Sequence, residues 1–235
     1  MAVRLTRAQS AARTRARLLA AAERVLFERG FHAASLEAVA EEAGLTKGAV
    51  YSQFESKADL FLAFQEERNE QTVGRTAEWF GALGPGDRPV DGVIDYWREK
   101  LLHDPAEYTL LVIEFWASAC RDPEIQRRFS EQHERLLVTT GKPLEEAASR
   151  LGVVLPLPAV ELLRLAAGIA HGLALERLMN PAKIDERMLE IAFAPLRELP
   201  GPGERKHPET GKFGGASIKG ARNDGARGRS GRRRG

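Results

Sequence analysis

The chain of 235 residues is 43% hydrophobic and 29% charged, so it is long enough to bury a core without disulfides or a metal. Its formal charge of +2 hides a basic segment, because residues 200–235 hold ten Lys and Arg against three acids. The single cysteine excludes a disulfide framework, and no uncharged stretch is long enough for a membrane span. The basic start lacks the apolar stretch of a secretory signal; its composition leaves a transit peptide open, but it leads directly into an amphipathic helix. We therefore expect a soluble, cytoplasmic protein.

Apolar residues recur at helical rather than strand spacing, which predicts an all-α fold. A first helix is expected to end near Gly30, where glycine is a common stop signal. Two short helices are expected to begin at Ser35 and Thr46. A fourth helix is expected to begin at Ser56, where Asp59 completes a capping box.

Longer helices are predicted after a Gly- and Pro-rich loop at residues 81–89. They are expected at residues 91–103, from the N-cap pair Asp104-Pro105, from Asp122-Pro123 to residue 151 with a kink favoured at 141–143, at 159–179, and from Asp185 to Glu198. Residues 200–235 are rich in Gly and Pro, and we expect a disordered basic tail that adds at most weak, sequence-independent attraction to phosphate groups.

Residues 43–46 join the second and third helices in a helix-turn-helix pattern. Gly44 supplies the positive φ that the sharp turn needs, Leu45 fills the angle between the helices, and Thr46 caps the next helix. The pattern alone is also common at ordinary helical corners.

The third helix carries a stronger indication of DNA binding. Val50 and Phe54 define its apolar face. The remaining positions form the outward face: Lys47, Gly48, Ala49, Tyr51 and Ser52. This face is small and carries a single charge, which suits a helix inserted in a major groove, whereas a merely solvated face usually carries several charges.

Many residues at fixed spacing resemble the DNA-binding domain of TetR-family transcriptional regulators over about residues 12–72. They are Thr14, Ala21-Ala22, Leu26-Phe27, Gly30-Phe31, Ser35-Leu36, Val39-Ala40, the run from Ala43 to Gly48, Tyr51, Phe54 and the run from Ser56 to Leu60. The resemblance implies an all-helical, two-fold symmetric homodimer. It also implies a DNA-binding domain (12–72), with its helix-turn-helix at 35–54, and a ligand-binding and dimerisation domain (73–199). Composition adds a basic N-terminal arm (1–11) and the basic tail (200–235).

The family's DNA contacts carry over residue by residue. Tyr51, Lys57 and the helix starts at Ser35 and Thr46 match phosphate contacts. The positions that match base-facing residues are Lys47, Gly48, Ala49 and Ser52. Only Lys47 and Ser52 offer a side-chain hydrogen bond, whereas Ala49 suits a thymine methyl. The alternative is that Tyr51 is a rim residue and Lys57 a helix-start lysine without a partner. The N-terminal arginines are either a solvated arm or further DNA contacts.

No pattern indicates catalysis, a cofactor or a metal site. The five histidines have no ligand spacing, and neither a phosphate-cradling glycine loop nor a nucleophile turn is present. We expect His171 to be a core or interface histidine and Cys120 to be a small buried hydrophobic residue.

Aromatic residues concentrate after residue 78, which raises the hypothesis of a ligand pocket. Its candidate residues are Trp79, Trp97, Tyr108, Glu114, Phe115 and Trp116. Core packing is the simpler interpretation for each aromatic residue. Glu114 is either a pocket carboxylate for a cationic ligand or a solvent-facing residue, and we slightly favour the latter.

We expect a ligand-responsive repressor that binds a palindromic DNA operator as a homodimer and responds to a small-molecule effector. The alternatives are an activator or ligand-independent regulator of the same fold, or a helical binding module with a purely structural helix-turn-helix. Residues 159–179 are apolar on nearly all sides, so this helix and the last one are expected to pair with their symmetry mates. Gly168 and Gly172 would allow the helices to approach closely.

Overall fold

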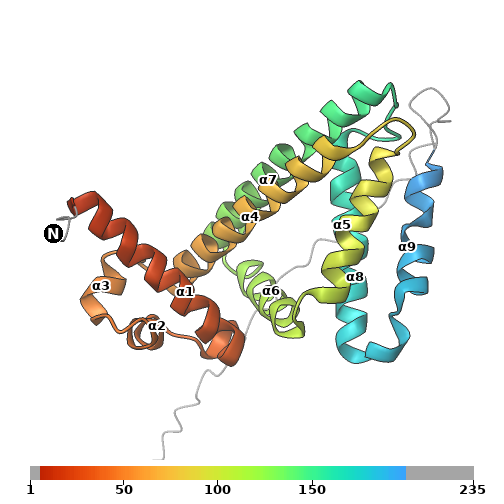
Figure 1. Cartoon of the computed structure of the whole chain (residues 1–235). Coiled ribbons are helices and arrows are strands. Elements are labelled where there is room, and N and C mark those ends of the chain that lie inside the picture. Colours follow the sequence, from red (N-terminus) through yellow and green to blue (C-terminus); the bar gives the residue numbers. More distant parts are fainter. Residues whose placement is uncertain (1–5, 200–235) are drawn as a thin grey trace, which may run out of the picture. The chain divides into compact units, whose positions relative to one another are not determined.

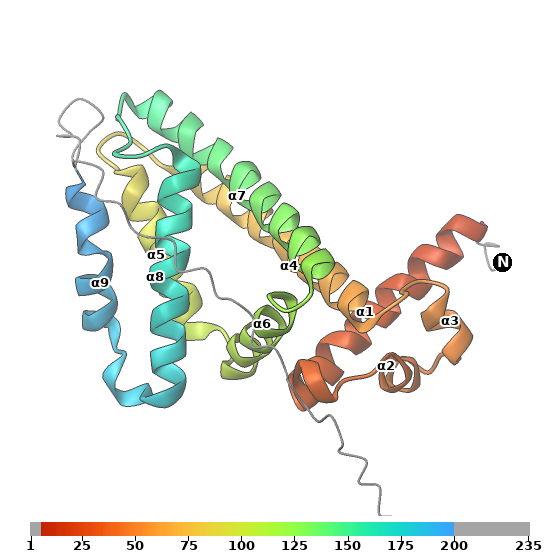
Figure 2. The same cartoon turned by 180° about the vertical axis from the view of Figure 1, so that it is seen from behind.

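The computed structural model describes residues 6–199, and every regular element among them is helical (Figure 1, Figure 2). The helices are α1 (Arg7–Ala33), α2 (Leu36–Glu42), α3 (Lys47–Tyr51), α4 (Lys57–Ala82), α5 (Pro89–His103), α6 (Ala106–Ala119), α7 (Pro123–Leu151), α8 (Ala159–Met179), the short 3₁₀ helix η1 (Pro181–Lys183) and α9 (Glu186–Glu198). The predicted all-α fold is confirmed. The expected basic tail lies outside the described residues.

The first hydrophobic core belongs to the N-terminal helices but includes part of α6. Leu18 of α1, Val50 of α3 and Phe61 of α4 are fully buried in it. Leu111 and Phe115 of α6 are equally buried in the same cluster. The helix-turn-helix is therefore packed against a helix that follows it by some 50 residues, and apolar burial of this kind stabilises the fold by about 25 cal/mol per Å².

The second core lies between α5, α7, α8 and α9, and α4 runs alongside α7 in both views (Figure 1, Figure 2). Its centre holds Val93, Leu144, Leu162 and Phe193, one from each of these helices. Helix α4 belongs to both parts of the molecule, because its first half carries Phe61 and its second half carries Phe80 of the second core. Among the described residues no helix is long and apolar enough to cross a membrane.

Both ends of α1 lie at other residues than expected. The helix begins at Arg7 because Thr6 and Gln9 form a reciprocal capping box, so residues 7–11 of the expected basic arm are helical. At the other end Gly30 takes φ 73° and ψ 173°, and one further helical turn follows it. Gly30 is thus a kink and not the last residue before a loop.

Outside the helix-turn-helix, three of the predicted N-caps are observed and one is wrong. Ser56, Asp122 and Asp185 accept backbone N–H groups at the starts of α4, α7 and α9. Asp104 was expected to cap α6, but its carboxylate pairs with Lys100 of α5 at 3.0 Å. An ion pair within one turn of α5 holds this side chain away from the next helix.

Beyond α6 one expectation is confirmed and one is corrected. Helix α7 runs through Pro143 to Leu151, the end that the sequence predicts. Cys120 is exposed and not buried, because it forms the C-cap of α6, where the chain turns towards α7. A helix end at the surface leaves no second layer of residues to cover the thiol.

Candidate nucleic-acid interface and internal cavity

The turn between α2 and α3 has the geometry that the sequence predicts. Gly44 has φ 62°, in the left-handed region that favours glycine, and the N–H of Leu45 donates to the carbonyl of Ala40 at 2.8 Å. Thr46 Oγ1 accepts the N–H of Ala49 at 3.2 Å and so caps α3. Ser35 caps α2 in the same way, accepting the N–H of Ala38. Both predicted helix starts are therefore in place with their caps.

The two faces of α3 are separated as predicted. Val50 is fully buried, Phe54 is 3% exposed, and Lys47, Gly48 and Ser52 are exposed on the outside. An added Cβ on Gly48 would meet only Thr46 Oγ1, at 3.9 Å, so the space in front of it is open. This outer face combines small size with a single cation, which allows close approach to a groove.

Ser52 and Ala49 contribute less to the outer face than their positions suggest. Ser52 is the C-cap of α3, and its hydroxyl donates to the carbonyl of Ala49 at 2.8 Å. Ala49 itself is half-buried. Lys47 is therefore the base-facing candidate with a polar side chain that is left without a hydrogen bond or ion pair among residues 6–199, although its charge acts on Glu37 and helps to lower the pKa of that carboxyl.

The two side chains expected to bind phosphate are both held by the protein. Tyr51 is 49% exposed, and its hydroxyl donates to Glu37 Oε1 at 2.7 Å, which lowers the pKa of Glu37 and raises that of Tyr51. Lys57 Nζ donates to the carbonyl of His32 at 2.7 Å and lies 4.7 Å from the Phe31 ring centre. Partial burial lowers the pKa of Lys57, with the nearby Glu114 charge acting in the opposite direction. This helix-start lysine therefore has a partner within the protein, and its assignment to DNA phosphate stays a prediction.

Two of the N-terminal arginines also have structural contacts. Arg17 Nη2 donates to the carbonyl of Ala43 at 2.7 Å, at the C-terminal end of α2. The Arg15 guanidinium lies 4.9 Å from the Phe54 ring centre. Arg7 and Arg13 are exposed on the first turns of α1. The arginines thus divide into a pair that braces the helix-turn-helix and a pair that faces solvent.

Glu114 lies in a position that sequence reasoning did not find. Its Oε2 accepts the N–H groups of Phe31 at 2.6 Å and His32 at 3.4 Å, directly after the kink at Gly30. It faces neither a pocket nor open solvent, because α6 packs against the end of α1. A carboxylate on α6 therefore holds backbone of the helix-turn-helix domain through charge-assisted hydrogen bonds.

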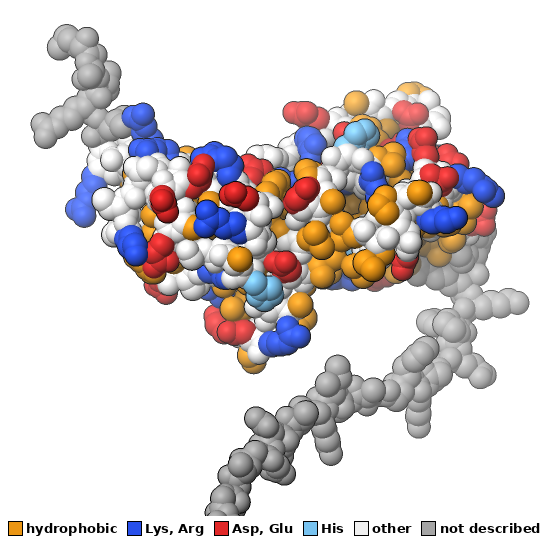
Figure 3. Space-filling model, turned by 90° about the horizontal axis from the view of Figure 1, so that it is seen from below, with side chains coloured by type: hydrophobic (Ala, Val, Ile, Leu, Met, Phe, Trp, Pro, Cys, Tyr) orange, Lys and Arg blue, Asp and Glu red, His pale blue; other side chains and the backbone are white. Residues whose placement is uncertain are grey.

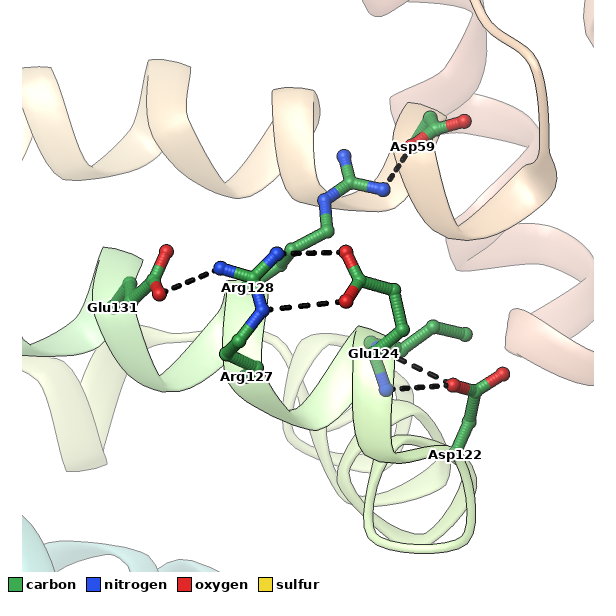
Figure 4. A network of polar contacts seen from close by, with 7 residues as sticks. Asp59, Asp122, Glu124, Arg127, Arg128 and Glu131 are labelled. Atoms are coloured by element: carbon green, nitrogen blue, oxygen red, sulfur yellow. Dashed lines mark hydrogen bonds and ion pairs between the residues drawn. The ribbon is translucent and has the colours of Figure 1, made fainter.

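A second polar contact joins α7 to the start of α4 (Figure 4). Arg128 Nη1 lies 2.6 Å from Asp59 Oδ1, while its neighbour Arg127 pairs with two glutamates of α7. Burial alone would raise the pKa of Asp59, but hydrogen bonds from Arg128 and Ser56 outweigh it and the pKa lies below its ordinary value. The start of α4 is thus tied to α7 by a paired carboxylate.

A cavity of about 400 Å³ lies between α4, α5, α6, α7 and α8. This volume falls within the range of small-molecule sites. Trp97, Tyr108 and Trp116 line it, as the pocket hypothesis supposed. Seen from below, hydrophobic side chains gather on the surface under this part of the molecule, whereas the helix-turn-helix end shows charged side chains of both signs (Figure 3).

Three candidate pocket residues do not line the cavity. Trp79 packs on Phe80 with ring centres 5.9 Å apart, and Glu114 and Phe115 point into the N-terminal core, where Phe115 stacks on Phe61 at 4.0 Å. The helical period explains the last two. Successive residues turn by about 100°, so Trp116 faces the cavity while Glu114 and Phe115 face α1 and α4.

The cavity also contains polar residues that the pocket hypothesis did not include. His171, predicted to be a core or interface histidine, lies with its ring 5.6 Å from Trp97 and 4.7 Å from Trp116. Burial, followed by the charge of His133, lowers the pKa of His171 to about 4. Lys100 and Gln132 are the other notable additions. A lone polar residue on an apolar helix face was the only available signal for them, and that signal is weak.

Two family models match the chain. One describes bacterial regulatory proteins of the tetR family and matches residues 18–64; the other describes the C-terminal domain of BetI-type transcriptional repressors and matches residues 100–200. Together they cover more than half of the chain, and the first contains the whole helix-turn-helix. The chain belongs to the TetR family. It is a helix-turn-helix transcriptional regulator.

The curated relatives of this TetR-family chain are transcriptional regulators, and one of them is named as an activator. The HTH-type transcriptional regulator UidR of Escherichia coli is 26% identical over 142 residues, covering 58% of this chain and 67% of that protein. The HTH-type transcriptional activator FasR of Mycolicibacterium smegmatis is 28% identical over 97 residues, covering 41% of this chain and 44% of that protein. Family membership therefore leaves the sign of regulation open.

Solved structures show the same fold. GusR of Salmonella enterica aligns with a TM-score of 0.60 at 20% identity, over 83% of this chain and 97% of that chain. FadR of Bacillus subtilis, solved in complex with stearoyl-CoA, aligns with a TM-score of 0.59 at 18% identity, over 78% and 96%. The arrangement of helices in this TetR-family regulator is thus shared with proteins of very different sequence.

Proposed function

We propose that this TetR-family regulator is a repressor whose dimer binds a palindromic operator and releases it when a small molecule occupies the cavity. The observation that carries the proposal is the double contact of α6. Trp116 of α6 lines the cavity, while Glu114, two residues earlier, accepts the N–H groups of Phe31 and His32. One helix therefore touches both the cavity and the helix-turn-helix domain.

The coupling follows from the stiffness of a helix. A ligand that displaces Trp116 moves Glu114 with it, because side chains two residues apart share the same rigid turn. The hydrogen bonds at the end of α1 then weaken, and the helix-turn-helix shifts between two arrangements. Only the difference in ligand affinity between those arrangements drives the release of DNA.

In the DNA complex we assign different work to the two groups of exposed residues. Tyr51, Lys57 and the helix starts at Ser35 and Thr46 bind phosphates and fix the register. Base edges are contacted by the outer face of α3: Lys47, Gly48, Ala49 and Ser52. Since Tyr51 and Lys57 already have partners, phosphate oxygens compete with Glu37 and the His32 carbonyl for them.

Dimerisation is assigned to the exposed side of α8 and α9. Several of the apolar residues expected at this interface are instead buried in the protomer's own bundle: Leu162, Leu163, Ala166, Leu189, Phe193 and Leu196. The exposed large apolar residues on these helices are Leu165, Leu175, Met179, Met188 and Ile191. Gly168 and Gly172 have open space where a Cβ would point, which favours close helix approach. We expect these two helices to form a four-helix interface with their symmetry mates.

One experiment separates the functional alternatives. Purified protein is tested for specific binding to DNA captured from its own genome, and a reporter behind that DNA is then measured with and without the regulator. Repression that is relieved by a cell extract fraction supports the proposal, and activation supports the FasR-like alternative. Failure to prefer any sequence over random DNA would contradict the operator-binding function, and a monomer at micromolar concentration by sedimentation would contradict the dimer.

A further inference from the structure

We propose that the cavity takes an aromatic carboxylic acid that also carries a hydroxyl group. This inference rests on the proposed function of the cavity as an effector site and adds the chemical class of the effector. Three independent features of the lining support it: the arrangement of aromatic rings, the unpartnered polar atoms and the excess of cations.

The aromatic rings form the walls at one end of the cavity. The His171 ring lies between Trp97 and Trp116, and Trp116 continues to Phe129 with ring centres 6.0 Å apart. Walls of this kind accept a flat ring by edge-to-face and offset stacking. An aliphatic chain would fill the same space without using these preferences.

The unpartnered polar atoms define what the ligand must offer. The indole N–H groups of Trp97 and Trp116 and the Oε1 of Gln132 are buried without a hydrogen-bond partner. The Gln132 amide nitrogen already donates to the carbonyl of Leu62 at 2.9 Å and to Glu66, which fixes the orientation of the amide. Two donors and one acceptor thus remain for a ligand, and a hydroxyl group both accepts and donates.

The charges of the lining favour an anion. Its cations are Arg68, Arg75, Lys100 and Arg177, and its one carboxylate is Asp104, which is already paired with Lys100 at 3.0 Å. Both Arg68 and Lys100 lie against the Tyr108 ring, at 4.0 and 5.7 Å from its centre, and Arg68 is also paired at 3.6 Å with Glu23, which lies outside the lining. A carboxylate near this tyrosine would face two cations, whereas a cationic ligand would have no free carboxylate among the lining residues.

The test uses calorimetric titration of the full-length protein with four matched probes: 4-hydroxycinnamate, its neutral amide, the amine tyramine, and cinnamate, which lacks the hydroxyl. We expect the hydroxy acid to bind at least about ten-fold more tightly than the amide, because a charge-assisted contact is lost. Tyramine should bind more weakly still, and cinnamate should bind several-fold more weakly than the hydroxy acid.

Variants locate the two ends of the ligand. Lys100→Met should cost the acid about ten-fold and leave the amide unchanged, while Asp104→Asn should tighten the acid because it frees Lys100. Arg98→Met on the same helix is the matched control, since Arg98 pairs with Asp95 and does not line the cavity. Trp116→Phe keeps a ring but removes the N–H, and it should remove the preference for 4-hydroxycinnamate over cinnamate.

The outcomes separate this inference from the proposed function. Equal or tighter binding of the amide or amine, or no binding of any acid below about 1 mM, overturns the chemical class while leaving regulation by another ligand intact. If the acid binds as described but the affinity for operator DNA does not change, the chemical class stands and the effector role fails. Thermal melts of each variant verify that the bundle is folded.

Discussion

The outer face of α3 and the wall of the cavity differ in the hydrogen-bonding groups that their side chains offer to a partner. Gly48 and Ala49 carry no hydrogen-bonding side chain, so this face offers a partner mostly shape and one cation. In the cavity, Trp97 and Trp116 carry buried N–H groups with no acceptor. The outer face of α3 is solvated until DNA binds to it. The cavity wall instead contains buried donors that gain a hydrogen-bond partner when a ligand binds.

This difference indicates how each site gains specificity. DNA binding by a small, open face requires that no bulky side chain fills it, so larger side chains there should weaken binding most. A cavity with unpartnered donors depends on what fills it, so changes of charge and hydrogen bonding should harm it most. The contact of Glu114 with the end of α1 connects the helix that lines the cavity to the helix-turn-helix domain.

Filling the space in front of α3 should have the largest effect. Gly48→Leu should weaken specific DNA binding by at least about 100-fold, because the side chain occupies the groove-facing space. The fold should persist, since an added Cβ meets no atom closer than 3.9 Å. Gly74→Leu on α4, also with open space, is the matched control and should bind DNA normally. Fluorescence anisotropy with operator and random DNA measures the binding of both variants. Normal binding by Gly48→Leu would contradict the insertion of α3 in the groove.

Acidification should destabilise the fold through His171, a residue of the cavity wall. Folding holds the pKa of His171 at about 4, against an ordinary value of 6.5, so the unfolded chain takes up a proton that the folded chain refuses. The contribution of His171 to the free energy of unfolding is therefore fully present above pH 6.5. It falls by about 2 to 3 kcal/mol as the pH drops towards 4. His171→Gln should flatten this part of the profile in denaturant titrations, while His103→Gln, at an exposed position, should not. Parallel profiles for wild type and His171→Gln would contradict the assignment.

The contact between α6 and α1 is tested at Gly30. Its φ of 73° strains any other residue, and an added Cβ would lie 2.8 Å from Glu114 Oε2. Gly30→Ala should destabilise the fold by about 2 to 3 kcal/mol and weaken DNA binding. Gly152→Ala is the matched control, because φ is 66° there with open space, and strain alone should cost about 1 kcal/mol. Equal losses of thermal stability in both variants would mean that Glu114 can move aside freely.

The smallest expected effect is that of Lys57. Lys57→Ala should weaken binding to operator and random DNA alike, by a few-fold, and lower the salt slope by about 0.9. By contrast Lys47→Ala should change which operator is preferred, at about 1–3 kcal/mol for a good base contact. Binding curves across a salt series distinguish the two. A shift in sequence preference for Lys57→Ala, with none for Lys47→Ala, would reverse the proposed orientation of α3.

The predictions that hold at the helix-turn-helix rest on local interactions. The cap at Thr46, the turn at Gly44 and the inward direction of Val50 and Phe54 all follow from contacts within a few residues. The bounds of α8 agree with the predicted 159–179 for the same reason, since Pro158 and Pro181 limit the helix from both sides. Family resemblance in this region rests on the same local pattern.

Long-range packing decided the rest. Glu114, Phe115 and Trp116 are neighbours in sequence, yet two of them complete the N-terminal core and one lines the cavity. Periodicity shows that they face different ways, but it cannot show what lies on each side, because α1 is about 80 residues distant along the chain.

The sequence by itself therefore determined the helices, the helix-turn-helix and its outward face, because turns, caps and the 3.6-residue period act over a few residues. Only the tertiary structure decided that Cys120 is exposed and that Lys100 and His171 share a cavity. It also decided that Glu114 holds the end of α1. Each of these depends on which distant helices pack together, and many different apolar faces satisfy the same burial requirement.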